Sequence, residues 1–165
     1  MSTNPTAAPA SGSARTARYR SKTLATWIAL GFGALGGLRF YLHGWRDAVG
    51  WLQLPPTLLG LWGAWRMHTL GQDDHLASVL VPLLGLMLSM AMLLAIISGL
   101  TPDERWDARH NPGLEPRATG WGPVLGVVLA LMVGGIVLMG TIAFAGQRFF
   151  EWQQQAALLR AVTAG

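Results

Sequence analysis

Uncharged apolar stretches dominate the pattern of this chain. Residues 23–38, 48–65, 76–102 and 118–147 contain no Asp, Glu, Lys or Arg. A membrane-spanning helix needs about 20 mostly apolar residues. The last two stretches exceed this length, the second reaches it, and the first reaches it if the helix continues to residue 42 with Arg39 snorkelling to the interface. The pattern therefore predicts an all-α integral membrane protein with four transmembrane helices.

The first two predicted helices form a tight, glycine-rich hairpin, because only residues 43–47 connect them. Gly33 and Gly37 form a GxxxG pair, and with Gly36 they predict a groove for close approach of another backbone. Pro55 and Pro56 remove two backbone donors from the second helix, which predicts a break or kink there. We expect the glycine groove and the kink to face each other.

The rest of the chain divides into a tail, a second helix pair and a C-terminal segment. Residues 1–19 have the Ser-, Ala- and Pro-rich composition of a disordered tail. Residues 75–147 are predicted to form the second pair of transmembrane helices, and the Asp73-Asp74 pair before this apolar run is interpreted as a helix N-cap. The connection over residues 101–120 carries mixed charges and three prolines, which indicate a solvated loop. Residues 148–165 are interpreted either as an amphipathic helix on the membrane surface or as an extension of the fourth helix.

Composition supports membrane insertion and suggests an orientation. Of the 165 residues 52% are hydrophobic and only 12% are charged, whereas soluble domains are about a quarter charged. The net charge of +4 predicts contact with anionic lipid headgroups, and no basic helix or aromatic platform suggests nucleic-acid binding. By the positive-inside bias four spans place both termini in the cytoplasm, with seven Lys or Arg residues inside and five outside. The interfacial basic cluster that drives this orientation consists of Arg15, Arg18, Arg20 and Lys22.

Several motifs occur in order over residues 20–74. They are Arg20-Ser21-Lys22, the glycine-rich run from Gly31 to Gly37, the connector Arg39-Phe40-Tyr41-Leu42-His43-Gly44, and Gly60-Leu61-Trp62 near the end of the second helix. In this order and spacing they resemble the two-transmembrane ("TM-two") domain family. The resemblance implies a two-helix membrane hairpin domain over residues 20–74. It implies no reaction, and residues 75–165 lie outside it.

The connector supplies the candidate contact residues Arg39, Phe40, Tyr41, Leu42 and Gly44. Arg39 is interpreted either as a snorkelling residue, with Asp47 as its intramolecular partner, or as a ligand for a lipid phosphate or a partner carboxylate. The four His residues are scattered, Cys is absent, and nothing places a nucleophile beside an oriented base. The sequence therefore predicts no enzyme activity, no cofactor and no metal site.

These observations predict a small protein of the bacterial inner membrane that acts as an accessory or scaffold subunit. Helix–helix or lipid contacts would carry this role, with the lipid bilayer and either a second copy or another membrane protein as partners. The alternative is an oligomeric channel or small-solute transporter, because irregular backbone at membrane depth is tolerated where it lines a cavity.

Overall fold

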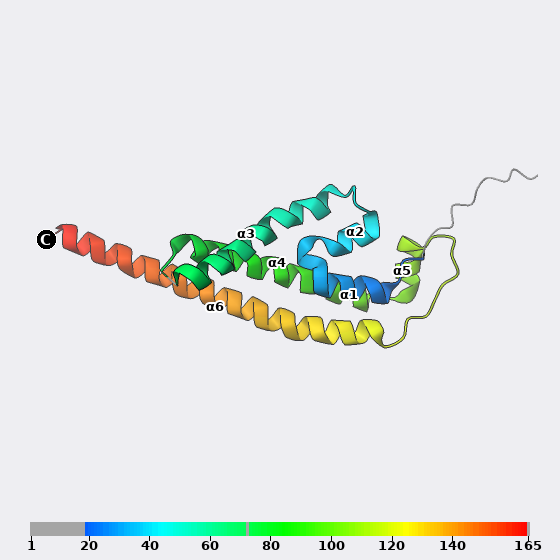
Figure 1. Cartoon of the computed structure of the whole chain (residues 1–165). Coiled ribbons are helices and arrows are strands. Elements are labelled where there is room, and N and C mark those ends of the chain that lie inside the picture. The colour runs from blue at the N-terminus through cyan, green and yellow to red at the C-terminus, as the bar shows by residue number, and fades with distance from the viewer. Residues whose placement is uncertain (1–18, 72, 165) are drawn as a thin grey trace, which may run out of the picture.

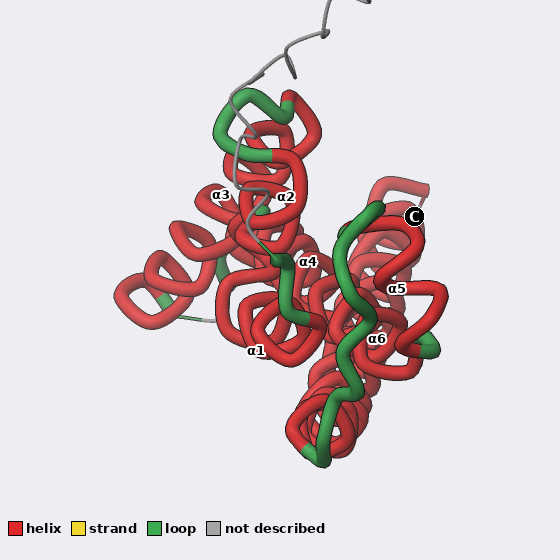
Figure 2. Tube along the Cα trace, turned by 90° about the vertical axis from the view of Figure 1, so that its right-hand side faces the viewer, coloured by secondary structure: helices red, strands yellow, loops and turns green. Residues whose placement is uncertain are grey.

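The computed structural model describes residues 19–71 and 73–164, and every regular element in this part of the chain is helical (Figures 1 and 2). The predicted tail over residues 1–19, apart from Tyr19, lies outside the described residues, as do Arg15 and Arg18. The elements are α1 (Lys22–Phe32), the 3-10 turn η1 (Gly33–Leu35), α2 (Gly37–His43), α3 (Ala48–Leu70), α4 (His75–Leu100), α5 (Asp103–His110) and α6 (Gly122–Ala164).

The first apolar stretch is a bent-back helical hairpin, so the single helix predicted through residue 42 is wrong. Ser21 N donates a hydrogen bond to the hydroxyl of Tyr41 at 2.9 Å. A continuous helix would hold these two residues about 30 Å apart, because each residue adds about 1.5 Å. The chain reverses at Gly36, which has a left-handed φ of 78°. A side chain strongly disfavours that conformation, so the glycine permits the turn.

Of the three long helices, α4 lies between α3 and α6 in sequence and runs antiparallel to both (Figure 1). If Gly60 and Gly63 of α3 carried a Cβ atom, it would lie 2.6 and 2.3 Å from the Cβ atoms of Leu84 and Leu80 of α4. The α4–α6 pairs are Gly85 with Thr141, Met92 with Gly134, and Gly99 with Val127, at intervals of seven residues. A glycine on one side of each pair lets the two backbones approach closely, as is typical of helices packed in membranes.

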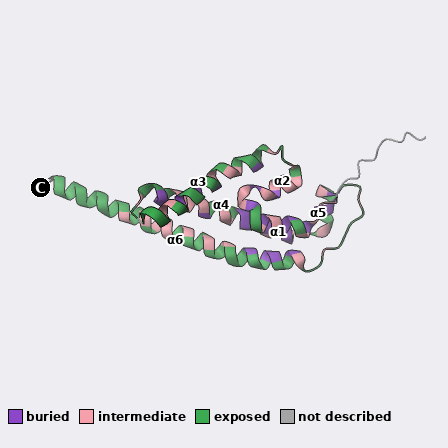
Figure 3. Cartoon of the chain, viewed as in Figure 1, coloured by how far each residue is buried: buried purple, intermediate pink, exposed green. Residues whose placement is uncertain are grey.

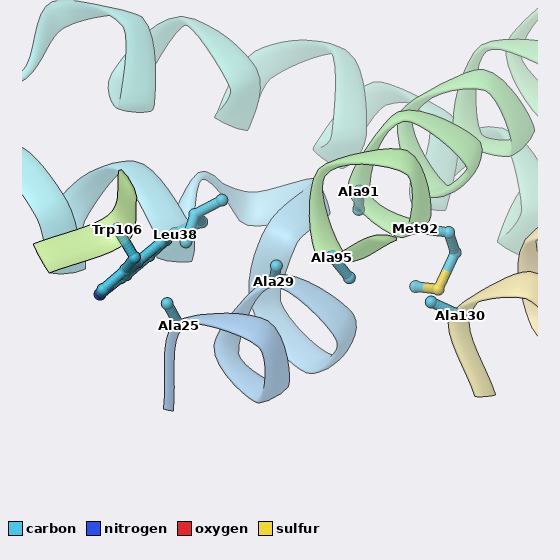
Figure 4. Close-up of a cluster of buried hydrophobic side chains, with 8 residues drawn as sticks. All are labelled: Ala25, Ala29, Leu38, Ala91, Met92, Ala95, Trp106 and Ala130. Carbon is cyan, nitrogen blue, oxygen red and sulfur yellow. The ribbon is translucent and has the colours of Figure 1, made fainter. Parts of the chain in front are cut away.

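The tip of the α1–α2 hairpin is packed inside the bundle. A Cβ atom at Gly33 would lie 2.9 Å from the Cβ of Ala91, and one at Gly36 would lie 2.5 Å from the carbonyl oxygen of Gly50. Thr57 Oγ1 donates to the carbonyl oxygen of Ala34 at 2.6 Å. This satisfies a carbonyl of the turn where the helix is broken. The buried core extends from α5 to the hairpin and consists mainly of alanines (Figure 4): Ala25, Ala29, Leu38, Ala91, Met92, Ala95, Trp106 and Ala130.

Gly33 and Gly37 do not form the predicted groove, although α3 does meet the glycine-rich run beside its prolines, since Thr57 bonds Ala34. Gly33 faces α4, whereas a Cβ on Gly37 would meet Phe32 of the same hairpin at 2.7 Å. The turn at Gly36 separates the two glycines, so they no longer share one helix face. Pro55 and Pro56 lie inside α3, which continues as one helix of 23 residues. The predicted break in this helix is therefore wrong.

The C-terminal segment extends the fourth apolar stretch, which decides between the two interpretations of residues 148–165. α6 continues without interruption for 43 residues. The ring of Trp152 in α6 lies beside the ring of His75, the first residue of α4, with 6.1 Å between the ring centroids. This contact marks the last part of α6 that lies alongside α4. Beyond Trp152 the helix projects from the bundle with its side chains exposed (Figures 1 and 3).

The two ends of the bundle carry different parts of the chain. We call the "α5 end" the end at which α1 and α6 begin, α4 stops and α5 lies; the "opposite end" holds the α3–α4 connection. At the opposite end Arg66 pairs with Asp74, and Asp74 caps α4 through Leu76 N at 3.1 Å, as predicted. Tyr19 lies at the α5 end, whereas α6 terminates past the opposite end (Figure 1).

Two helices are long and apolar enough to cross a membrane, His75–Leu100 and Gly122–Thr163. α3 has a spanning length, but its Trp, Gly and Pro residues lower its mean hydropathy, and α1 with η1 is a shorter apolar helix. The protein is thus all-helical in its described part, with two candidate membrane spans by length and composition.

The turn at Gly36 can be tested against a matched glycine. Gly113, in the turn closed by Leu114 N and the carbonyl oxygen of Asn111, also has a positive φ, of 80°, but a Cβ there would meet no heavy atom within 4 Å. Gly113→Ala should therefore cost only the backbone penalty of about 1–2 kcal/mol. Gly36→Ala should cost roughly 1–3 kcal/mol more through overpacking against Gly50. Thermal unfolding in detergent, followed by circular dichroism, measures both; equal shifts would argue against the buried turn.

Candidate functional site

Polar side chains from four parts of the chain meet at the α5 end. The contributing parts are residues 19–22, the α4–α5 junction, α5 itself and the connection before α6. α5 begins after Pro102, with Asp103 and Glu104 in its first turn and Arg109 and His110 in its last. This placement suits the helix dipole and explains why the segment predicted to be a solvated loop forms a short helix.

An ion pair fixes the start of α1 to the start of α5. The Lys22 side chain, only 9% exposed, pairs with Asp103 and also donates to the carbonyl oxygen of Thr101 at 3.0 Å. Asp103 accepts further hydrogen bonds from Thr119, whose backbone N lies 2.9 Å away. The bond from Lys22 and then those from Thr119 lower the pKa of Asp103 to about 2. The charge of Lys22 is thus neutralised within the protein, where it joins α1 to α5.

A second group of bonds ties α5 to the residues before α1. Asp107, which is buried, accepts from the Asn111 amide at 2.7 Å, from the Tyr19 hydroxyl at 2.9 Å and from Arg117 N at 3.0 Å. The bond from Asn111 is the largest cause of the lowered pKa of Asp107. Trp106, 3% exposed, donates its ring N–H to the carbonyl oxygen of Arg20 at 2.8 Å. These partners hold the backbone of Arg20 in place.

A half-open cavity of about 610 Å³ lies beside this network. Most of its lining is apolar or aromatic, and Arg20 supplies the cationic group. Phe40 stacks on the indole of Trp45, with ring centroids 5.3 Å apart, beside the cavity. The cavity is lined by Tyr19, Arg20, Leu24, Phe40, Tyr41, His110, Asn111, Pro112 and Leu114.

The electrostatic balance at the cavity is positive. Burial lowers the pKa of His110, and the charges of Arg109, Arg20 and His43 lower it further. His110 is therefore neutral near pH 7, and Arg20 remains as the charge in the lining. The two nearby carboxylates, Asp103 and Asp107, are already engaged by Lys22, Thr119, Asn111 and Tyr19.

The structure brings some of the predicted residues together and separates others. Arg20 of the basic cluster and Phe40 and Tyr41 of the connector line one cavity. Arg39 instead lies 3.8 Å from the carboxylate of Asp47, the partner predicted for it. Leu42 packs on the buried core, and Gly44 follows the last residue of α2. The connector is therefore divided between the cavity, the core and a surface ion pair.

Sequence reasoning missed the contribution of α5. The reading of residues 101–120 as a solvated loop is wrong at Trp106, Asp107 and Asn111, which are buried. Two signals were available in the sequence: acidic residues directly after Pro102, typical of a helix start, and a Trp within a polar segment. Neither signal reveals that the partner of this helix lies more than 80 residues earlier in the chain.

Comparison of this chain with models of known protein families, with curated protein sequences and with solved structures finds no match.

The Lys22–Asp103 pair can be tested with a neighbouring control. Asp103→Asn leaves the enclosed Lys22 ammonium without its counter-ion. We expect a cost of about 2 kcal/mol, between that of an exposed pair and that of a fully buried one. Glu104→Gln, on the exposed side of the same turn, should change stability by less than about 0.5 kcal/mol. Chemical unfolding in detergent compares the two variants; similar losses would contradict a structural role for the pair.

The same pair predicts a pH window. Because the pKa of Asp103 is lowered to about 2, against about 3.9 when unfolded, its contribution is complete above about pH 4. It disappears as the pH falls towards about 2. Melting temperatures measured between pH 5 and 2 should therefore fall more steeply for the unmodified chain than for Asp103→Asn. Parallel curves would show that Asp103 is not the group that titrates.

Proposed function

We propose that this chain is a non-enzymatic integral membrane protein that serves as an accessory or scaffold subunit through contacts with lipid and with other membrane helices. In this proposal α3, α4 and α6 cross the membrane. The α1–α2 hairpin enters from the α5 end and returns to it. The arrangement replaces the four spans expected from the apolar stretches with three spans and one re-entrant hairpin.

The geometry of the hairpin supports this topology. The start of α1 and the end of α2 are joined by the bond from Ser21 to Tyr41. Broken backbone at membrane depth is tolerated where protein covers it. Gly33 and Gly36 at the tip are both buried, against α4 and α3.

The distribution of basic residues supports one orientation. With the hairpin re-entrant, nine Lys or Arg residues belong to the α5 side and three to the opposite side, a larger bias than the seven and five of a four-span arrangement. The positive-inside rule then places the N-terminus in the cytoplasm and the C-terminus outside. The nine are Arg15, Arg18, Arg20, Lys22, Arg39, Arg46, Arg105, Arg109 and Arg117; the three are Arg66, Arg148 and Arg160.

The length of α6 is the observation that carries the scaffold role. A helix of 43 residues is about 65 Å long, whereas a bilayer core is about 30 Å thick. The excess projects beyond the bundle at the opposite end. Leu158 and Leu159, each 68% exposed, and Val162, 80% exposed, are not covered by the described part of the chain. Apolar side chains outside the membrane core favour a protein or lipid-surface partner.

Pull-down from the native membrane tests the scaffold role. The tagged chain, purified in mild detergent, should bring down a stoichiometric partner detectable by native mass spectrometry. Replacing Leu158 and Leu159 together by Gln should reduce that partner by roughly tenfold, because a hot-spot pair contributes at least about 1.4 kcal/mol. The control replaces Gln153 by Ser, because this exposed residue lies on the opposite face of α6 from the two leucines. A chain that purifies alone, with or without these changes, would contradict the proposal.

A channel or small-solute transporter formed by several copies is the second candidate, favoured by the re-entrant hairpin. Because the tip of the hairpin is packed against α3 and α4, a pore would have to form between copies of the chain. Purified chain that assembles into a defined homo-oligomer and conducts solute in liposomes would favour this function over the scaffold. Absence of flux in both neutral and anionic liposomes would eliminate it.

Cysteine labelling tests the proposed topology cleanly, because the chain contains no native Cys. Single variants Ser11→Cys, Trp45→Cys and Thr163→Cys report the tail, the α2–α3 connection and the end of α6. We expect an impermeant maleimide to label Thr163→Cys on intact spheroplasts, and the other two only after permeabilisation.

The pair Ser11→Cys and Trp45→Cys distinguishes the alternatives. A re-entrant hairpin places the two positions on the same side, whereas a spanning first helix places them on opposite sides. Opposite labelling would therefore refute the hairpin. The resemblance of residues 20–74 to the TM-two family remains a prediction under either result.

A further inference from the structure

The cavity at the α5 end has one arginine, Arg20, in its lining. No ion pair joins the Arg20 guanidinium to any carboxylate in the part of the chain that the structure describes. Its backbone is fixed from both sides, because Arg20 N donates to Asn111 Oδ1 at 2.7 Å and its carbonyl oxygen accepts from Trp106. The bonded backbone fixes the position from which the Arg20 side chain extends, and its charge lies close enough to His110, another lining residue, to lower the pKa of that histidine. Lys22, the neighbouring basic residue of the network, differs from Arg20 because Asp103 neutralises its charge.

A hydrogen-bond donor accompanies this charge. The Tyr41 hydroxyl accepts a bond from Ser21 N at 2.9 Å, and this leaves its own O–H free to donate to a ligand. A guanidinium together with a hydroxyl donor is a typical arrangement for a phosphate oxygen, because charge-assisted bonds to phosphate are short and strong.

An apolar wall of four residues accompanies Tyr19, His110 and Asn111 in the lining, and it lies at the level where α1 and α6 begin. Leu24 is in the first turn of α1 and Phe40 is in α2, and Pro112 and Leu114 close the side formed by the α5–α6 connection. Trp45, 74% exposed, and Trp51 surround Phe40 as interfacial aromatic residues do. A small, water-soluble anion would leave this apolar wall uncovered. An amphipathic anion would cover it.

We infer that the cavity binds the phosphate headgroup of an anionic phospholipid through Arg20 and Tyr41, with the start of its acyl chain against Leu24 and Phe40. This inference rests on the proposed membrane insertion, which places the α5 end at the cytoplasmic leaflet. That leaflet is rich in anionic lipids. The volume of about 610 Å³ lies within the range of small-molecule sites.

Native mass spectrometry of the full chain, titrated with phosphatidylglycerol or phosphatidylcholine in detergent, tests the site. The unmodified chain should retain phosphatidylglycerol preferentially. Arg20→Gln should weaken that retention about tenfold, the equivalent of one charge-assisted hydrogen bond. Arg105→Gln removes the same charge from an exposed position of α5 outside the cavity, and it should leave retention unchanged. Tyr41→Phe should weaken retention by a smaller factor than Arg20→Gln.

Two results would overturn the inference. Equal retention by Arg20→Gln and Arg105→Gln would mean that general surface charge attracts the lipid. Displacement of the lipid by millimolar inorganic phosphate would identify a site for free phosphate in place of a phospholipid. Recovery of each variant from the membrane fraction is measured in parallel. A chain recovered without the membrane contradicts the proposed function, whereas a membrane-bound chain lacking the lipid preference contradicts only the assignment of the cavity.

Discussion

The reversal of the chain at Gly36 is the constraint on which the rest of this structure depends. Only a residue without a side chain adopts its positive φ at little cost while lying against the carbonyl of Gly50. Because the chain turns back there, α3 begins at the same end as α1. Every later helix therefore runs in the opposite direction from the one that a straight first helix would impose. The end of the bundle at which α6 terminates, the end occupied by α5 and the distribution of the later basic residues between the two ends all follow from this one turn.

Close backbone approach is the second principle of the bundle, and α4 is at its centre. Glycines of α3, α4 and α6 provide most of the near contacts between the long helices, and alanines form most of the core beside the hairpin (Figure 4). Lipid tails are as apolar as leucine, so burying large apolar side chains gains little in a membrane, whereas close packing of small ones gains dispersion energy. Many positions of α6 are exposed (Figure 3), and large apolar residues occupy many of them, which suits the proposed contact with lipid.

The α5 end shows how one group of charges can serve two purposes. Lys22, Asp103 and Asp107 are satisfied within the chain and fasten residues 19–22 to a helix more than 80 residues away. Arg20 lies among them with its backbone bonded and its charge unopposed. A cation that is held in place and left unneutralised, beside an apolar wall, is available to a ligand. Lys22, Asp103 and Asp107, by contrast, form bonds that stabilise the fold.

The sequence by itself determined the helical class, the positions of α4 and most of α6, the cap at Asp74 and the pairing of Arg39 with Asp47. These features depend on apolar composition, local capping and short sequence separation. Tertiary structure alone decided that α1 and α2 turn back on each other, that α3 continues through Pro55 and Pro56, and that Arg20 lines one cavity with Phe40, Tyr41 and α5. A glycine-rich run is compatible with a straight helix as well as with a turn. Only the surfaces of α3 and α4, which cover the tip and bond its exposed carbonyl, make the turn the stable choice.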